Sequence, residues 1–131
     1  MISFWYTILY VADVEKTLEF YETVFWFTRK FITDEKDYGE LMSWDTTLAF
    51  ASIELGKSHD TSMQEQNLEK STLPFEIAFT TDEVDAYYSK ALEHWAVSVA
   101  IPQLKPWGQT VSYVRDINGF LVEICSPISA Q

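Results

Sequence analysis

The side chains that most often perform chemistry are scarce in this 131-residue chain and lie far apart. His59 and His94 have no His or Cys partner at the spacing of a metal site. His94 falls at the end of a predicted helix, where it can interact with the negative helix terminus. Cys125 is the only cysteine and lies in an apolar run, which predicts a core residue rather than a nucleophile. Glycine-rich phosphate loops and serine nucleophile motifs are absent, so these common classes of active site are not indicated.

Acidic side chains outnumber basic ones, with 20 Asp and Glu against 9 Lys and Arg and a net charge of −11. Binding to a nucleic-acid backbone or to an anionic membrane surface needs clustered basic residues, so we expect neither partner. The same charge would attract a cationic ligand. The sequence holds no apolar run near the roughly 18 residues of a membrane span, and its first residues lack the features of a signal peptide. We therefore expect a cytoplasmic protein.

The first half of the chain has the hydrophobic pattern of a strand, a helix and three further strands. Apolar residues recur at spacings of four, three and four from Val14 to Phe25, which predicts one face of an amphipathic helix. Asp13 is the predicted N-cap of this helix because its side chain can accept from free amides of the first turn. Strands are predicted at residues 4–11, 25–31, 38–43 and 46–53, with Trp44-Asp45 at a hairpin turn.

The second half repeats this order at an offset of about seventy residues. Asp82 is the predicted N-cap of a helix whose apolar stripe runs from Val84 to Trp95. The dipeptide Asn118-Gly119 predicts a type I′ hairpin turn, because both residues tolerate positive φ. Strands are predicted at residues 74–80, 97–100, 107–115 and 120–125.

The repeat predicts one α+β domain over residues 1–131, built from two tandem βαβββ modules. Module 1 spans about residues 1–55, a polar connector spans 56–73, and module 2 spans about 74–126. We expect the modules to form a curled mixed sheet around a cleft, with the helices outside. Neither half alone would cover the open face of its sheet, so two halves of one chain, or of two chains, would enclose that cleft.

Two segments carry a family resemblance. Residues 8–14 (Ile-Leu-Tyr-Val-Ala-Asp-Val), followed by Phe20-Tyr21, resemble the opening of the vicinal oxygen chelate superfamily, which includes glyoxalase I, bleomycin resistance proteins and extradiol dioxygenases. Residues 107–109 (Trp-Gly-Gln) and 113–123 resemble its closing hairpin. The resemblance spans nearly the whole chain. It implies paired βαβββ modules and a homodimer with clefts between modules.

In metal-dependent members of this superfamily the ligands come from the first and last strands of each module. The resemblance places Tyr6, Phe50, Glu76 and Glu123 at these four positions. A protonated phenol and a phenyl ring are poor ligands for a divalent ion, so we expect no family-type metal centre and no cofactor. One alternative is a divalent-metal-dependent lyase or isomerase in which Glu76 and Glu123 hold the ion, or in which one of them acts as a general base.

The remaining expectation is an acidic and aromatic cleft that binds a small cationic or planar molecule without chemistry, which resembles the bleomycin resistance branch. A second alternative is a non-catalytic paired-module interaction protein. The residues expected to line the cleft are Tyr6, Phe50, Glu76, Trp107, Tyr113 and Glu123. Aromatic residues at strand spacing are often core residues, so the two glutamates are the stronger candidates.

The chain has only 4 glycines and carries 5 tryptophans. Trp26, Trp44 and Trp95 stand at turns where relatives in the superfamily commonly have glycine. A left-handed tryptophan costs on the order of 1 kcal/mol relative to its relaxed conformation. Either these turns adopt other conformations, or the indole rings regain the energy by packing on the core or on a partner chain.

Overall fold

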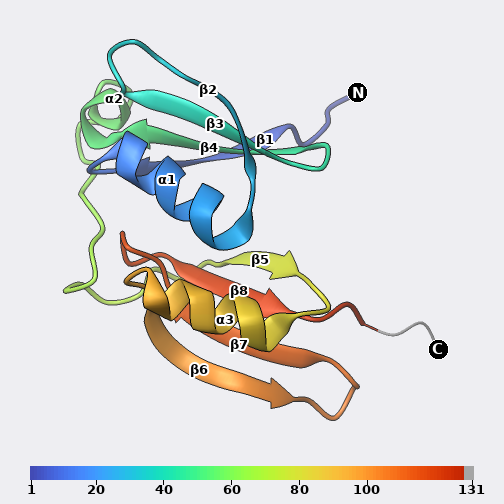
Figure 1. Ribbon diagram of the computed structural model, residues 1–131. Helices are drawn as coiled ribbons and strands as arrows, with labels where there is room; N and C mark the ends of the chain where they lie inside the picture. Colours follow the sequence, from blue (N-terminus) through green and yellow to red (C-terminus); the bar gives the residue numbers. More distant parts are fainter. Residues whose placement is uncertain (129–131) are drawn as a thin grey trace. The chain divides into compact units, whose positions relative to one another are not determined.

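The computed structural model describes residues 1–128 and has an α+β fold; the last three residues of the predicted 1–131 domain lie outside the described part. The chain divides between Glu65 and Gln66 into two compact units, here called unit 1 and unit 2. This boundary falls inside the predicted connector 56–73. Each unit contains one βαβββ module with its own four-stranded, unclosed sheet (Figure 1).

Unit 1 has the strand order β1-β4-β3-β2, in which β1 pairs with β4 in parallel and the other neighbours are antiparallel. Helix α1 packs against β2, β3 and β4. The short helix α2 follows β4 directly and was not predicted. The elements are β1 (Tyr6–Val11), α1 (Val14–Phe25), β2 (Thr28–Ile32), β3 (Tyr38–Ser43), β4 (Thr46–Ser52) and α2 (Ile53–Lys57).

Unit 2 repeats this connectivity with the strand order β5-β8-β7-β6, again with one parallel pair, β5 with β8. Helix α3 packs against β6, β7 and β8. The predicted tandem repeat is therefore confirmed. No helix among residues 1–128 has the length and apolar character needed to cross a membrane. The elements are β5 (Ile77–Thr80), α3 (Val84–Glu93), β6 (Val97–Leu104), β7 (Thr110–Arg115) and β8 (Leu121–Cys125).

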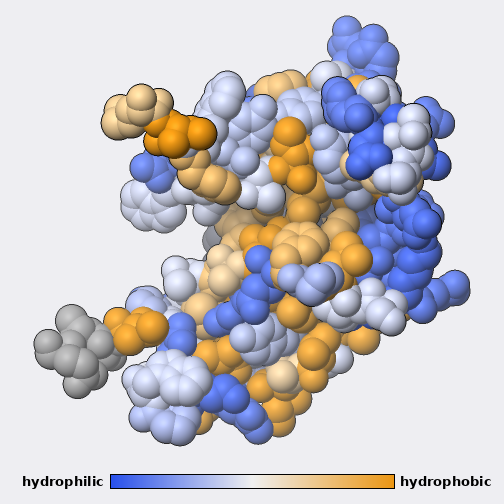
Figure 2. Space-filling model, turned by 180° about the vertical axis from the view of Figure 1, so that it is seen from behind, coloured by the Kyte–Doolittle hydropathy of each residue, from blue (hydrophilic) through white to orange (hydrophobic). Residues whose placement is uncertain are grey.

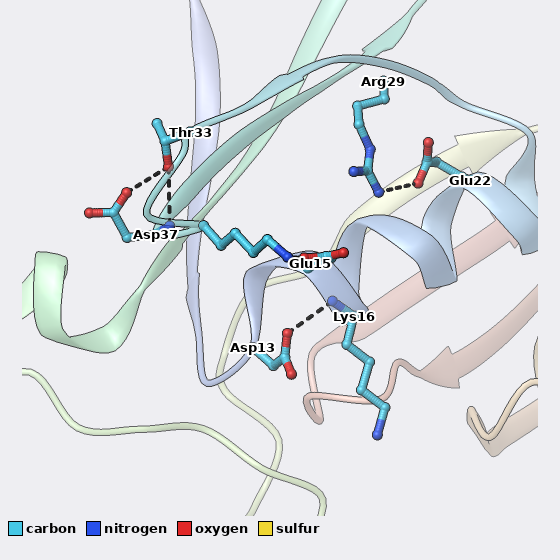
Figure 3. A network of polar contacts seen from close by, with 8 residues as sticks. Asp13, Glu15, Lys16, Glu22, Arg29, Thr33 and Asp37 are labelled. Atoms are coloured by element: carbon cyan, nitrogen blue, oxygen red, sulfur yellow. Dashed lines mark hydrogen bonds and ion pairs between the residues drawn. The ribbon is translucent and has the colours of Figure 1, made fainter.

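The first residues of the two helices differ in how they are capped. Asp13 caps α1 as predicted, and its Oδ1 accepts from the Lys16 amide at 3.0 Å (Figure 3). The prediction for α3 was wrong: its N-cap is Glu83, not Asp82, and the Glu83 side chain makes no capping hydrogen bond. Instead the Thr81 hydroxyl oxygen accepts from the Glu83 amide, which moves the helix start one residue along the chain.

Polar contacts join α1 to the neighbouring strands of unit 1. An ion pair of 2.7 Å links Arg29 of β2 to Glu22 of α1 (Figure 3). A second pair of 2.7 Å links Lys36, in the β2–β3 turn, to Glu15 near the start of α1. Both pairs are partly exposed, so each contributes little to stability. They mainly fix how the β2–β3 hairpin lies beside the helix.

The loop between β7 and β8 differs from the predicted two-residue turn. Only Gly119 has a positive φ, of 88°, and Asn118 does not. The fully buried Asp116 carboxylate accepts from the amides of Asn118 and Phe120. A Cβ at position 119 would lie 2.6 Å from the Asn67 backbone. Glycine is required there both by its conformation and by this close approach.

The second part of the connector is bound to that loop. The Arg115 guanidinium donates to the carbonyl oxygens of Gly119, Asn67 and Lys70, at 2.7–3.2 Å. The Gln66 side chain, 7% exposed, also donates to the Gly119 carbonyl, at 3.2 Å. Residues 66–70 are therefore an ordered part of unit 2 that is hydrogen-bonded to the β7–β8 loop, not a free linker.

The three tryptophans at turns keep the left-handed conformation. Trp26, Trp44 and Trp95 have φ values of 62°, 57° and 82°, and their exposed fractions are 73%, 96% and 82%. Within the units these indole rings are therefore not packed on the core. The strain at each turn is not offset by burial of its own side chain.

Each sheet has one face against its helix and one face turned away from it, here called the open face. The helix-facing side is the core: Tyr21 of α1 stacks on Phe50 of β4, with ring centroids 5.1 Å apart. In unit 2 the side chains of Val114, Val122 and Ile124 are at most 1% exposed on this side. Strand alternation then places the intervening residues on the open faces.

Candidate functional site

The open face of unit 2 brings together three of the predicted site residues, Glu76, Tyr113 and Glu123. Glu123 of β8 pairs with Tyr113 of β7 on one side and with Ala78 of β5 on the other. Glu76 precedes Ala78 by two residues and therefore shares its face. The Tyr113 hydroxyl donates to Glu123 Oε1 at 3.1 Å. Strands β7 and β8, together with the residue that precedes β5, thus present two carboxyl groups and a phenol on one surface.

The two carboxyl groups of this cluster share a hydrogen bond and titrate as a pair. This bond with Glu123, together with burial and the negative charge of Glu123, raises the pKa of Glu76 to about 7. Burial acts to raise the pKa of Glu123 as well, but hydrogen bonds from Glu76, Cys125 and Tyr113 hold it below its usual value. Near neutral pH the pair therefore exchanges between one and two negative charges.

The groups around the pair stay protonated at neutral pH. Burial and the hydrogen bond to Glu123 raise the pKa of Tyr113 to about 12. Burial and the same carboxylate raise the pKa of the Cys125 thiol to about 11. A thiol with a raised pKa is a poor nucleophile, which agrees with the predicted structural role of Cys125. The Tyr113 hydroxyl donates to Glu123, and the Cys125 thiol donates to the Phe79 carbonyl oxygen at 3.6 Å.

Trp107 lies in the turn between β6 and β7, with 55% of its surface exposed. Its indole Nε1 donates to Gln109 Oε1 at 2.8 Å, and Gln109 Nε2 donates to the Ser126 carbonyl at 3.0 Å. Gln109 also forms a hydrogen bond with Cys125 that acts to lower the thiol pKa. Gln109 therefore connects Trp107 to the side chains next to Glu123. Sequence reasoning missed this glutamine, since a single Gln in a turn carries no periodic signal.

Tyr6 lies on the open face of unit 1, among polar residues that sequence reasoning did not select. Tyr38 of β3 donates its hydroxyl to Glu40 Oε2 at 2.6 Å, and Lys30 Nζ lies 3.4 Å from Glu40 Oε1. Burial is the main cause that raises the pKa of Tyr38, and the hydrogen bond to Glu40 is the next largest. The neighbouring Tyr6 raises the Tyr38 pKa further. The alternating Tyr-Gly-Glu of residues 38–40 was the available signal, because it puts both polar side chains on one face.

Phe50 does not line an open face, and its prediction as a site residue was wrong. It is 0% exposed and stacks on Tyr21, on the helix-facing side of β4. The register shows why: Ile8 pairs with Ala49 in unit 1 as Ala78 pairs with Glu123 in unit 2. Ala49 is therefore the counterpart of Glu123. A shift of one residue moves a side chain to the opposite face of a strand.

The donors present do not fit a family-type metal centre. Of the four expected ligand positions, unit 1 offers the Tyr6 phenol and the methyl group of Ala49, which has no lone pair to donate. Unit 2 offers only the two carboxyl groups of Glu76 and Glu123. Within residues 1–128 there is no group of three or more His, Cys, Asp or Glu side chains arranged to hold an ion.

Comparison with known proteins places this chain in a family. A model of the glyoxalase-like domain matches residues 4–129. No curated protein matches the sequence. Solved structures share its fold over nearly the full length of both chains. A glyoxalase-related enzyme from Fulvimarina pelagi has a TM-score of 0.82 at 15% identity, covering 97% of this chain and 89% of that one.

Two further structures have the same fold. A member of the glyoxalase/bleomycin resistance protein/dioxygenase superfamily from Sphaerobacter thermophilus has a TM-score of 0.73 at 20% identity, covering 97% of this chain and 99% of that one. A glyoxalase/bleomycin resistance protein/dioxygenase from Nocardioides has a TM-score of 0.71 at 16% identity, covering 100% and 87%. At these identities the likeness concerns the fold. With two βαβββ modules and a family match over nearly its whole length, the chain belongs to the glyoxalase-like domain family of the vicinal oxygen chelate superfamily.

Proposed function

We propose that this protein binds a small, planar, cationic molecule at the open face of unit 2, without a family-type metal centre. Glu76 and Glu123 would supply charge pairing, and Tyr113 an aromatic edge. Trp107 would contribute an indole surface at the rim. The single observation that carries the proposal is the pair of carboxyl groups held together on one sheet face, with the Tyr113 hydroxyl bonded to only one of them.

Charge favours a cation over other ligands of the same size. Glu40 on the open face of unit 1 already has Lys30 beside it, whereas no cationic side chain of unit 2 is ion-paired with Glu76 or Glu123 among the described residues. A cation placed between the two carboxyl groups would replace their shared proton, and both groups would then be charged. Ligand affinity should therefore rise as pH increases from about 6 to about 8, since the Glu76 pKa is about 7.

Isothermal titration calorimetry with two probes tests this proposal: bleomycin, a cationic glycopeptide, and proflavine, a planar cation. We expect micromolar binding of at least one probe, weakened about tenfold or more in Glu123→Gln, since charge-assisted hydrogen bonds contribute about 1.5–3 kcal/mol. The matched control is Glu93→Gln, which removes the same charge at the end of α3. Absence of saturable binding, or equal weakening by both variants, would contradict the proposal.

The metal-dependent alternative has a direct test of its own. Elemental analysis of purified protein with and without added Mn²⁺, Ni²⁺ and Zn²⁺ measures bound metal per chain. Our proposal predicts substoichiometric metal that does not change in Glu123→Gln. Stoichiometric metal that disappears in this variant would instead support a lyase or isomerase in which Glu76 and Glu123 hold the ion.

A further inference from the structure

The turn between β6 and β7, which carries Trp107, is closed by its own backbone hydrogen bonds. The Lys105 amide donates to the Gln109 carbonyl oxygen at 2.8 Å, and the Gly108 amide donates to the Lys105 carbonyl oxygen at 2.9 Å. Gly108 has a φ of 89°, a conformation that glycine adopts without strain. In Figure 1 the turn lies at the end of the β6–β7 hairpin, and the surface there is pale in Figure 2, neither strongly hydrophilic nor strongly hydrophobic.

The position of the Trp107 indole depends on one side chain, that of Gln109. The indole Nε1 donates to Gln109 Oε1 at 2.8 Å. More than half of Trp107, 55%, is exposed, so packing restrains the ring only weakly. The closed backbone of the turn fixes where the side chain begins, and the hydrogen bond to Gln109 fixes where its ring lies.

Gln109 is itself anchored on its other side. Its Nε2 donates at 3.0 Å to the carbonyl oxygen of Ser126, which directly follows β8. An indole N–H can only donate and a carbonyl oxygen can only accept, so the two bonds together set the orientation of the amide. Ser126 is bound in turn to Thr110 by two hydrogen bonds of 2.9 Å. Gln109 thus ties an exposed ring to the ends of two paired strands.

The same side chain lies on the open face of unit 2, at a distance from the carboxyl pair. Residue 109 directly precedes β7, and strand alternation gives it the same face as Tyr113, which pairs with Glu123. Cys125 lies between them: burial is the main cause that raises its pKa, Glu123 raises it further and Gln109 lowers it. At about 3.3 Å per residue, the four residues from Gln109 to Tyr113 span about 13 Å along the strand.

We propose that Gln109 is a positioning residue, which holds the Trp107 indole at one end of the open face so that the site selects elongated planar cations over short ones of the same charge. This inference rests on the proposed function, because Glu76 and Glu123 would bind the charge of the ligand. A cation with a single ring that lies at the carboxyl pair would not extend to the indole. A fused-ring cation would reach both and gain an additional aromatic contact.

Calorimetric titration with two planar monocations tests the inference: proflavine, which has fused rings, and benzamidine, which has a single ring. Gln109→Leu releases the indole, which binding would then have to order. We expect this variant to weaken proflavine binding by about threefold to tenfold, and to leave benzamidine binding unchanged. The matched control is Gln64→Leu, the same substitution at an exposed position of unit 1, which should change neither affinity.

A double-mutant cycle separates positioning of the indole from a general structural role. Trp107→Phe keeps an aromatic ring but removes the N–H group that Gln109 binds. In this background Gln109→Leu should have no further effect on proflavine binding. Equal weakening of both ligands by Gln109→Leu would overturn the inference, and so would the same effect in both backgrounds.

The indole N–H signal of Trp107 in heteronuclear NMR spectra supplies a readout without ligand. The signal is identified by its loss in Trp107→Phe, and its exchange with solvent should become faster in Gln109→Leu but not in Gln64→Leu. An unchanged exchange rate would overturn the positioning role. If Gln109→Leu does not fold, Trp107→Phe removes the same hydrogen bond at an exposed turn and should weaken proflavine binding alone; equal weakening of benzamidine binding would contradict the inference.

Glu123→Gln distinguishes failure of this inference from failure of the proposed function. If wild type does not bind proflavine, or binds it equally well as Glu123→Gln, the proposed function fails and the selectivity fails with it. If Glu123→Gln weakens binding of both ligands but Gln109→Leu weakens neither, the carboxyl pair binds the cation and only the role of Gln109 is overturned.

Discussion

The open faces of the two units have the same backbone but different chemistry. In unit 1, Glu40 lies between a tyrosine hydroxyl and the Lys30 ammonium group, so its charge is compensated locally. In unit 2, Glu123 lies beside a second carboxyl group, Glu76, and the pair retains a proton near neutral pH. A duplicated module can thus balance the charge of a carboxylate on one face and leave a net negative charge on the other. The difference arises from a few side chains at equivalent register positions.

The prediction with the largest expected effect tests whether Phe50 lies on the helix-facing side of β4. Phe50→Ala removes a fully buried ring that stacks on Tyr21, and should lower the free energy of unfolding by about 3–5 kcal/mol. Urea denaturation followed by circular dichroism measures the change. Tyr6→Phe keeps an aromatic ring on the open face and should alter stability far less. A small effect of Phe50→Ala would mean that the ring is not part of the core.

The second prediction concerns the shared proton of unit 2. The Glu76 pKa is raised from 4.5 to about 7, so the protonated form stabilises the folded state. This contribution is full below about pH 4.5 and is lost as pH rises to about 7. Glu76→Gln can donate a hydrogen bond to Glu123 at every pH. The variant should therefore gain stability relative to wild type between pH 5 and pH 8.

Unfolding curves of both proteins at pH 5 and pH 8 provide the measurement. Glu93→Gln is the control, because it removes a carboxyl group at the end of α3, outside the pair, and should keep the pH dependence of wild type. A stability difference between Glu76→Gln and wild type that is the same at both pH values would show that the two carboxyl groups do not share a proton.

The smallest expected effect concerns the strained turns that end α1 and α3. Trp95→Gly relieves a left-handed backbone and should be neutral or stabilise unit 2 by up to about 1 kcal/mol. Thermal unfolding gives the value. Clear destabilisation would show that the indole is packed and contributes to stability.

Much of the architecture could be predicted because apolar periodicity and the internal repeat agree. The hairpin of residues 38–43 and 46–53 was predicted to within one residue, since Trp44-Asp45 interrupts two clear strands. Strand β6 was predicted to end at residue 100 but continues to Leu104. Pro102 usually stops a strand, but at a sheet edge it leaves no inward hydrogen bond unmet.

The site was predicted less completely than the fold. The resemblance selected Glu76, Tyr113 and Glu123, which the structure brings together. Phe50 was misplaced because residues 48–51 (Leu-Ala-Phe-Ala) are apolar on both faces of the strand, so alternation could not fix the register. Gln109 was missed for a different reason, since its role depends on contacts with Trp107 and Ser126 that lie outside any local pattern.

The attachment of residues 66–70 to the β7–β8 loop determines where this chain could be divided. A fragment that begins at the predicted start of module 2, residue 74, would lack the carbonyl groups of Asn67 and Lys70 that Arg115 binds. It would also lack Gln66, which supports the backbone of Gly119. A fragment for recombination or separate expression must therefore be longer than the repeat. It must include residues 66–73 of the connector, which precede the second module.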